Sequence, residues 1–352
     1  MVVGNGGLKT GMDARLERKL RILALIATGG VVGGIVYVLF KGPVSAISFA
    51  DGIAYGLLIS LAIGGVGIAL ETGRVGLWLG GLSFTTNLVI RSVIYAAIIV
   101  PIQFFQLGTV LVGQTPVYSA ETFWSATLYS AAFLAMMNLF LGIGNIIGPR
   151  AFLNFITGRY HAPVEENRFV LFVDIAGSTG LAERLGGVGI HRFLDRTFRL
   201  LTLSVVDYRG EVLNYIGDEV IVTWPENSGA VDCRPLRCFL AMRAALARAS
   251  QQFEREFGAA PQIRGSLHFG PVIVGEIGDV KRAIVFNGDV MNTAARLEEL
   301  SRGVDGGFLA SRAAMQRFRS TPPFAVRDLG QLAIRGRADG IEVVGLGAPV
   351  SA

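Results

Sequence analysis

Four long apolar stretches limit most strongly what this chain can fold into. They cover residues 21–40, 52–70, 88–107 and 123–147. Each is close to the roughly 20 residues that an α-helix needs to cross the hydrocarbon core of a bilayer. Hydrophobic residues make up 51% of the 352 residues, which is more than ordinary soluble proteins carry. The sequence therefore predicts a membrane domain of four helices over residues 21–148.

The distribution of basic residues predicts how these helices are oriented. The N-terminal segment, residues 1–20, is rich in Lys and Arg, whereas the opposite side of a four-span bundle contains Lys41 and little else. On the same side as that segment lie Arg74, Arg91, Arg150 and Arg159. Because cytoplasmic loops carry the excess of Lys and Arg, the N-terminus and the long C-terminal half are both expected in the cytoplasm. We predict a multi-pass protein of the inner (plasma) membrane, whose first span is retained as an anchor.

Three charged residues lie in or beside the predicted spans, namely Asp51, Glu71 and Arg91. A charge deep in a membrane helix is a candidate for function. All three can be placed near the ends of spans, so we interpret them as interfacial anchors. Arg91 fits this interpretation least well, because the third span can start earlier.

The first span also contains two pairs of glycines, which are Gly29, Gly30, Gly33 and Gly34. Small residues let the backbones of two membrane helices approach closely. We therefore predict close helix packing at these glycines, in preference to a ligand-binding loop.

Charge and cysteine content argue against several other classes of protein. The net charge of +5 is small for this length, and the chain lacks the dense basic patch of a nucleic-acid surface. We expect no nucleic-acid partner. The two cysteines, Cys233 and Cys238, have no metal-binding residues in a suitable pattern around them. Buried thiols in a reducing compartment are favoured over a disulfide or a zinc site.

Residues 149–167 join the two halves of the chain. Pro149 and Gly158 bracket a short helical run, and Pro163 ends it. One interpretation is a plain linker. We prefer a coupling element that sets the geometry of two catalytic domains, because the segment directly precedes the first strand of the following domain.

From residue 168 onward the hydrophobic pattern alternates between strands and helices. Strands are predicted at 168–175, 211–216, 220–224, 262–269, 272–275 and 283–286, and helices at 179–208, 231–256 and 289–301. Residues 307–318 add a short strand and a helix, and two or three strands close the chain. This order predicts an α+β domain over residues 168–352, with a mixed sheet covered by helices.

Two aspartates stand beside apolar runs in this domain. Asp174 ends one such run and is followed by the small residues Ala176, Gly177, Ser178 and Thr179, and Asp218 lies in the segment NYIGDEVIVTW. Two carboxylates near a small-residue turn form a candidate site for Mg²⁺ and phosphate. Residues 177–179 open a helix, so their N–H groups can bind phosphate oxygens. The alternative is that an aspartate serves as a helix N-cap.

Four blocks of sequence then occur in a characteristic order. They are FVDIAGST, NYIGDEVIVTW, SLHFGPVIVGEIG and NGDVMNTAARLEEL. Together they make residues 168–347 resemble the catalytic domain of the class III nucleotide cyclases, the adenylyl/guanylyl cyclase family. The resemblance implies a ferredoxin-like domain that works as a homodimer with active sites at the interface.

The resemblance also implies a role for each matching residue. Asp174 and Asp218 match the two metal-binding aspartates, and the Ile175 carbonyl matches the backbone ligand. They would hold two divalent cations, Mg²⁺ or Mn²⁺, which assist attack by the poorly nucleophilic ribose 3′-oxygen. Asn292 matches the residue that orients the ribose. Arg296 matches the residue that stabilises charge on the α-phosphate.

The spacing of Asn292 and Arg296 agrees with these roles. Residues four apart lie on one face of a helix. A solvated face that also carries Glu298 and Glu299 is the alternative. In the family, the metal-binding and Asn/Arg halves of one site come from opposite protomers.

The chain departs from the family at the positions that contact the base. Adenylyl cyclases usually have Lys and Asp there, and guanylyl cyclases commonly have Glu and Cys. Here Asn214 stands four residues before Asp218, and Val285 stands seven residues before Asn292. Asn214 can donate and accept hydrogen bonds, whereas Val285 can only pack. Lys281 and Arg282 can contact the base or a phosphate, or form a solvated basic turn.

We therefore predict a membrane-bound adenylate cyclase, a phosphorus–oxygen lyase that converts ATP to 3′,5′-cyclic AMP and pyrophosphate. Two alternatives stay open because of the altered base positions. One is a guanylate cyclase, and the other is a non-catalytic nucleotide-binding signalling protein with a degenerate cyclase domain. A transporter or channel is disfavoured, because the spans contain no convincing buried charge pair.

Overall fold

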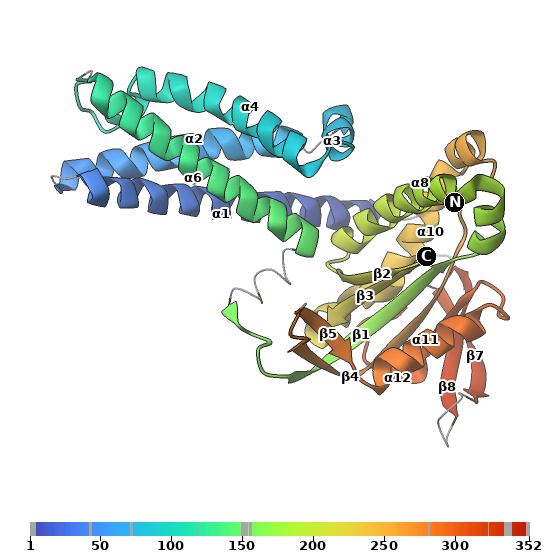
Figure 1. Ribbon diagram of the computed structural model, residues 1–352. Helices are drawn as coiled ribbons and strands as arrows, with labels where there is room; N and C mark the ends of the chain where they lie inside the picture. The colour runs from blue at the N-terminus through green and yellow to red at the C-terminus, as the bar shows by residue number, and fades with distance from the viewer. Residues whose placement is uncertain are drawn as a thin grey trace. The chain divides into compact units, whose positions relative to one another are not determined.

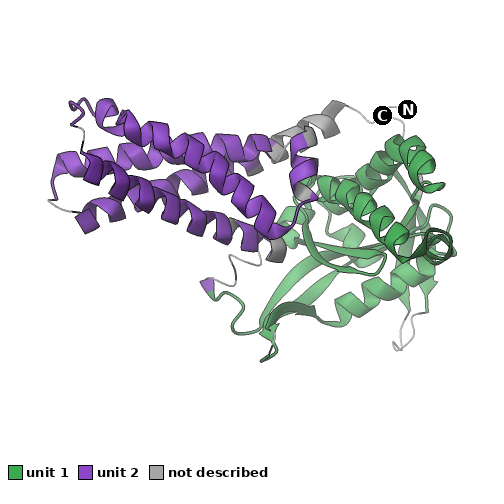
Figure 2. Ribbon diagram, turned by 45° about the horizontal axis from the view of Figure 1, so that its top comes forward, with its two compact units in different colours: residues 1–15, 158–352 green, residues 16–157 purple. Residues whose placement is uncertain are grey.

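The computed structural model describes residues 5–41, 44–70, 73–117, 119–148, 154, 157–280, 282–322, 324–333 and 340–349. The chain forms two compact units (Figure 2). The membrane unit comprises residues 16–157, and the sheet unit comprises residues 158–352 together with residues 1–15. The regular elements described in the membrane unit are all helices, whereas the sheet unit mixes strands and helices (Figure 1).

The membrane unit is built from four long helices, α1 (Asn5–Lys41), α2 (Ala46–Leu70), α4 (Phe84–Phe104) and α6 (Ala120–Ile147). Two short helices, α3 (Gly73–Gly80) and α5 (Leu107–Leu111), lie between them in the chain. By length and composition, four segments can cross a membrane, which are Lys19–Lys41, Ala46–Leu70, Phe84–Phe104 and Ala120–Gly144. Successive long helices run in opposite directions (Figure 1). The predicted four spans are confirmed.

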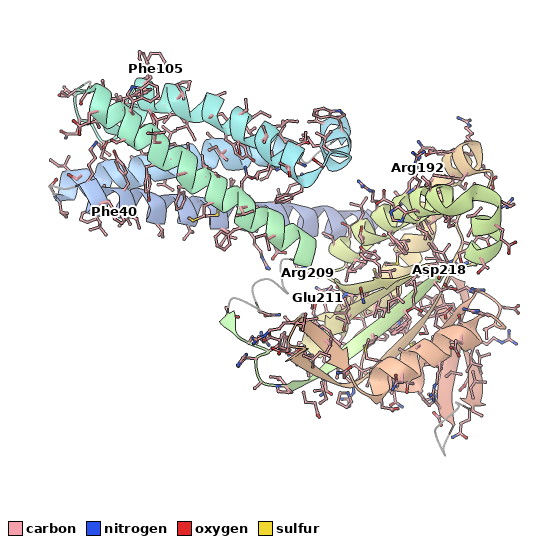
Figure 3. All side chains as sticks on the ribbon, in the orientation of Figure 1. Phe40, Phe105, Arg192, Arg209, Glu211 and Asp218 are labelled. Atoms are coloured by element: carbon pink, nitrogen blue, oxygen red, sulfur yellow. The ribbon has the colours of Figure 1, made fainter. Side chains whose placement is uncertain are left out.

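Many apolar side chains of this unit face outward, as a lipid environment requires. Phe40 is 85% exposed and Phe105 is 63% exposed, and both lie at the end of the bundle where α1 and α4 finish (Figure 3). The helices begin earlier than the apolar stretches do. Asp51 is therefore the sixth residue of α2 and Arg91 the eighth of α4, about one to two turns inside each span. Glu71 lies outside the described residues.

Glycines allow α1 and α2 to pack backbone against backbone. A Cβ atom built on Gly34 would lie 2.0 Å from the Gly52 carbonyl oxygen, and one built on Gly30 would lie 2.4 Å from the Gly56 carbonyl oxygen. Any larger residue at these positions would push the helices apart. The close packing predicted for the first-span glycines is confirmed, and α2 supplies matching glycines.

The sheet unit contains an open, mixed sheet of eight strands. Its order is β2-β3-β1-β4-β6-β8-β7, with β5 also paired to β4. Only the β4–β6 pair is parallel among the described strands. The strands are β1 (Val164–Ile175), β2 (Glu211–Ile216), β3 (Glu219–Pro225), β4 (Ile263–Ile277), β5 (Ala283–Asn287), β6 (Phe308–Ser311), β7 (Phe324–Leu332) and β8 (Ile341–Pro349). The predicted α+β class is confirmed.

Helices cover both faces of this sheet (Figure 1). The long helices α8 (Ser178–Asp207) and α10 (Arg234–Phe257) pack on one face, and α11 (Asp289–Ser301) packs on the other. Short helical segments occur at α9 (Glu226–Gly229), η1 (Val231–Cys233) and α12 (Arg312–Gln316). Both cysteines are free and buried, as predicted.

The alternation of side chains along β1 decides where its last residues point. Phe169, Leu171 and Val173 belong to the core beneath α8 and α10. Val170 and Phe172 belong to the smaller core beneath α11. Because side chains alternate between the two faces of a sheet, Asp174 faces the α11 side.

The segment between the units is only partly described. Residues 149–153, 155 and 156 fall outside the described residues, and β1 already begins at Val164. The role of residues 149–167 as a coupling element stays a prediction.

Candidate active site

Strand pairing brings Asp174 and Asp218 to the same end of the sheet. Asp174 pairs with Glu219 on β3 and with Arg264 on β4. Asp218 lies in the tight turn between β2 and β3, where Gly217 adopts a φ of 62° in the left-handed region. The Ile175 N–H donates a hydrogen bond of 3.2 Å to the Asp218 carbonyl oxygen. Asp174 on β1 therefore lies beside the β2–β3 turn that carries Asp218.

Each aspartate has a defined polar neighbour. The Ser178 hydroxyl donates a hydrogen bond to Asp218 Oδ2, which ties the start of α8 to the β2–β3 turn. Arg264 Nη2 donates to Asp174 Oδ2 at 2.5 Å. Arg302 lies farther away, with its Nη2 3.9 Å from the same oxygen.

Acidic groups outnumber the arginines around Asp174. Burial raises the pKa of Asp174, and the Asp218 carboxylate raises it further, while the hydrogen bond from Arg264 acts in the opposite direction. Burial and the nearby carboxylates, that of Glu298 above all, raise the pKa of Glu219 to about 7. Burial and the Asp174 carboxylate raise the pKa of Glu298 to about 6. Since like charges close together are unfavourable, an added cation would be stabilised here.

The oxygen atoms at this position suit a hard divalent cation. The carboxylates of Asp174 and Asp218 and the carbonyl of Ile175 are the oxygen ligands that Mg²⁺ and Mn²⁺ prefer. Within the described residues, no three His, Cys, Asp or Glu side chains are arranged to hold a metal ion. Mg²⁺ usually takes its remaining ligands from water and substrate phosphates. The residues therefore fit such a cation without a third protein side chain.

The small-residue turn after β1 leads directly into α8. Gly177 is the N-cap of this helix, with a φ of 74°, and Ser178 is its first residue. The first N–H groups of a helix have no partners within the helix and can bind phosphate. Gly177 and Thr179 are exposed to solvent. Because Gly177 caps α8 and a strand follows Asp218, the N-cap alternative is wrong for both aspartates.

Asn292 and Arg296 lie together on one face of α11. The opposite face of this helix is buried through Val290, Ala294 and Leu297. Asn292 is exposed and Arg296 is half-buried. Among the described residues, no hydrogen bond or ion pair links these two side chains to either aspartate.

Comparison with known proteins identifies the family. The family model described as "Adenylate and Guanylate cyclase catalytic domain" matches residues 161–345, which is more than half of the chain. The chain belongs to this family.

Relatives of known description agree with the assignment. "Adenylate cyclase 2" of Rhizobium meliloti is 34% identical over 223 residues, which cover 63% of this chain and 61% of that protein. The "Adenylate cyclase" of Anabaena cylindrica is 24% identical over 205 residues, which cover 56% of this chain and 40% of that protein. This chain thus spans less than two thirds of either relative.

A solved structure confirms the fold. The solved structure of a bacterial light-regulated adenylyl cyclase superposes on this chain with a TM-score of 0.54 at 20% sequence identity. The likeness covers 62% of this chain and 64% of that chain. The sheet unit therefore has the ferredoxin-like fold of a class III cyclase domain.

The predicted base-contacting residues lie on separate strands of the cyclase domain. Asn214 is exposed on β2, next to an irregularity in the β2–β3 pairing, and its Oδ1 accepts a hydrogen bond of 3.0 Å from the Tyr215 N–H. Val285 lies on β5, opposite Gly275 of β4. Strands β3, β1 and β4 separate the two in the sheet order. Lys281 lies outside the described residues. The side chain of Arg282 forms an ion pair with Glu276, with 3.5 Å between Arg282 Nη1 and Glu276 Oε1.

Four residues of this site were not predicted from the sequence. Arg264, Arg302, Glu219 and Glu298 surround Asp174. Glu219 directly follows Asp218, so its place near the site could have been predicted from the sequence. Arg264 becomes visible only when the register of β1 against β4 is known, since 90 residues separate it from Asp174.

Proposed function

We propose that the protein is a membrane-bound adenylate cyclase, which converts ATP to 3′,5′-cyclic AMP and pyrophosphate. The observation that supports this most directly is the buried Asp174 beside Asp218, at the N-terminal end of α8. In the reaction, the ribose 3′-oxygen forms a bond to the α-phosphorus as the bond to pyrophosphate breaks. The 3′-hydroxyl gives its proton to solvent water, and pyrophosphate leaves with the electron pair of the broken P–O bond.

Residues of this chain would organise the triphosphate. Asp174, Asp218 and the Ile175 carbonyl would hold two divalent cations, Mg²⁺ or Mn²⁺. When bound, such cations make the 3′-oxygen a better nucleophile and neutralise phosphate charge. The N–H groups of residues 177–179 would receive phosphate oxygens, and the hydrogen bond from Ser178 fixes the orientation of Asp218.

A second copy of the chain would complete each site. Asn292 and Arg296 are presented on the outward face of α11, without bonds to the aspartates of the described chain. In a homodimer, Asn292 of one copy would orient the ribose bound by the other. Arg296 would stabilise the charge that develops on the α-phosphate, a form of electrostatic catalysis.

The location follows from the four spans. We propose the inner (plasma) membrane, with the N-terminus and the cyclase domain in the cytoplasm, where ATP is present. The cluster of basic residues before the first span supports this orientation.

GTP is the second candidate substrate, because neither Asn214 nor Val285 is the usual adenine-contacting residue. To test this, purified full-length protein is incubated with MnCl₂ and either ATP or GTP, and the products are separated by chromatography. We expect cyclic AMP to be the main product. If cyclic GMP is the main product instead, the protein is a guanylate cyclase. Turnover of neither nucleotide, with binding of a non-hydrolysable ATP analogue, would support the non-catalytic alternative.

A matched pair of variants tests the site itself. Asp218→Ala removes one of the two aspartates, whereas Asp195→Asn alters an exposed acid that pairs with Arg199 farther along α8. Loss of turnover in the first and retention in the second is expected. Full activity of Asp218→Ala would contradict the proposed site.

A further inference from the structure

A cavity opens inside the membrane unit, away from all the residues assigned to the cyclase reaction. Its volume is 330 Å³, within the range of sites that hold small molecules. Residues of α1, α2, α4, α5 and α6 line it. Several of them lie at the end of the bundle where α1 finishes at Lys41 and α2 starts at Ala46.

The lining of this cavity is mostly apolar but includes several polar side chains. Polar side chains that reach it include Tyr37, Lys41, Asp51, Tyr55, Gln103 and Ser130. Gln103 is 8% exposed, and its amide donates a hydrogen bond of 3.2 Å to Ser130 Oγ. Ionisable and amide groups inside membrane spans are unfavourable unless they have partners or line a functional cavity.

Asp51 is the acidic group in this lining, and its side chain has a hydrogen bond with Thr109 that engages only part of the carboxylate. Its Oδ1 atom is buried and accepts no hydrogen bond from the described residues. Lys41 is the basic residue among the lining residues, and its ammonium group donates a hydrogen bond of 2.5 Å to Ser125 Oγ. Among the ion pairs of the described residues, none joins Lys41 to Asp51. A buried carboxylate oxygen without a partner is unfavourable, so a bound cation would stabilise it.

Aromatic side chains surround the same space in a fixed arrangement. Tyr37 and Tyr129 both line the cavity, with ring centroids 5.0 Å apart. Tyr129 donates a hydrogen bond of 2.8 Å to the Gly33 carbonyl, and Tyr37 lies 3.2 Å from Ser125 Oγ. Tyr129 also stacks on Phe133, which is a further lining residue. Aromatic rings attract organic cations through their electron-rich faces.

We propose that this cavity binds a small organic amine. The ammonium group pairs with Asp51, and the apolar part of the ligand packs among Tyr37, Tyr129 and Phe133. A metal ion is a poorer fit, because the lining offers one carboxylate among aromatic rings. With the predicted orientation of the spans, the site lies toward the outer surface of the membrane.

The first experiment compares two probes of equal size on the full-length protein in lipid nanodiscs. Radiolabelled 2-phenylethylamine is cationic at neutral pH, whereas 2-phenylethanol is neutral. We expect saturable binding of the amine, above its uptake by empty nanodiscs, and displacement by the alcohol only at a concentration at least tenfold higher. Non-saturable uptake, or equal potency of the two probes, would overturn the proposal.

The second experiment changes the carboxylate. Asp51→Asn should weaken binding of 2-phenylethylamine at least tenfold. Glu121→Gln is the matched control, because Glu121 stands in the first turn of α6 but does not line the cavity. It should leave binding unchanged. Equal binding by Asp51→Asn and wild type would contradict the proposal, and the two-probe comparison stays decisive if that variant does not fold.

Discussion

Asp51 of the membrane unit and Asp174 of the cyclase domain are two acids with buried carboxylate oxygens and opposite surroundings. Asp174 has an arginine at 2.5 Å and three other acids near it. Asp51 lines an aromatic cavity, and its Oδ1 atom has no partner among the described residues. The cyclase domain therefore carries its own counter-charge, which substrate and cations would rearrange. In the membrane unit, the proposed amine would supply the positive charge that faces Asp51.

The largest difference between the two aspartates is expected in catalysis. Asp174→Asn should lower ATP turnover by roughly 10²–10³-fold, because a ligand to the proposed cations is lost. Asp51→Asn should keep basal turnover within about twofold, since the proposed amine site lies outside the reaction. Initial rates of cyclic AMP formation by the full-length variants measure both. If both variants lose ATP turnover to a similar extent, the two aspartates do not have the separate roles proposed for them.

The dimeric arrangement gives the next largest effect. Asp174→Asn and Arg296→Ala chains should each be nearly inactive alone. When the two are co-expressed in equal amounts, about half of the dimers are mixed, and each mixed dimer has one intact site. Turnover should recover to about a quarter of the wild-type value. Rates no higher than those of the separate variants would show that the two halves belong to one chain.

Arg264 tests the counter-charge of Asp174. Arg264→Ala should lower the free energy of unfolding of the cyclase domain by about 1–3 kcal/mol, because a buried carboxylate loses its charged partner. MnCl₂ should raise the melting temperature of this variant more than that of wild type, since the cation replaces the missing charge. Differential scanning fluorimetry of full-length protein, with and without MnCl₂, measures this. Arg312→Ala, which removes an exposed pair with Glu342, is the control.

The smallest effect is on the pH dependence of stability without divalent cations. The folded cyclase domain holds the pKa of Glu219 at about 7, above its ordinary value of 4.5. At intermediate pH the folded state therefore binds more protons than the unfolded state, and stability falls as the pH rises through this window. Melting temperatures measured in EDTA should decline toward pH 7. Glu219→Gln should flatten that decline, and an unchanged slope would contradict the assignment.

The two-part organisation could be predicted because its signals are local. Apolar stretches long enough to span a bilayer and the four cyclase blocks depend on neighbouring residues alone. The residue at which α2 begins was harder to predict from the sequence. Ser45 Oγ accepts a hydrogen bond from the Ser48 N–H at 3.1 Å, so the helix begins in a polar segment. Asp51 therefore lies inside a span, where hydropathy alone placed it at the edge.

The surroundings of Asp174 show what local signals miss. Arg264 reaches it only because β1 and β4 pair in one particular register. Glu298 approaches from α11, across the smaller core of the domain. These contacts depend on long-range packing, which neither periodicity nor spacing encodes. The roles of Asn292, Arg296, Asn214 and Val285 in the reaction stay predictions.

The glycine contacts between α1 and α2 have a mechanical consequence. The backbones of α1 and α2 lie so close at Gly30 and Gly56, and at Gly34 and Gly52, that a side chain at these positions would collide with the facing helix. If a ligand changes the shape of the cavity, we expect the other lining helices, which include α6, to shift more than the close contact between α1 and α2. That helix runs from Ala120 at the cavity end to Ile147 and is the last long helix of the described residues before β1.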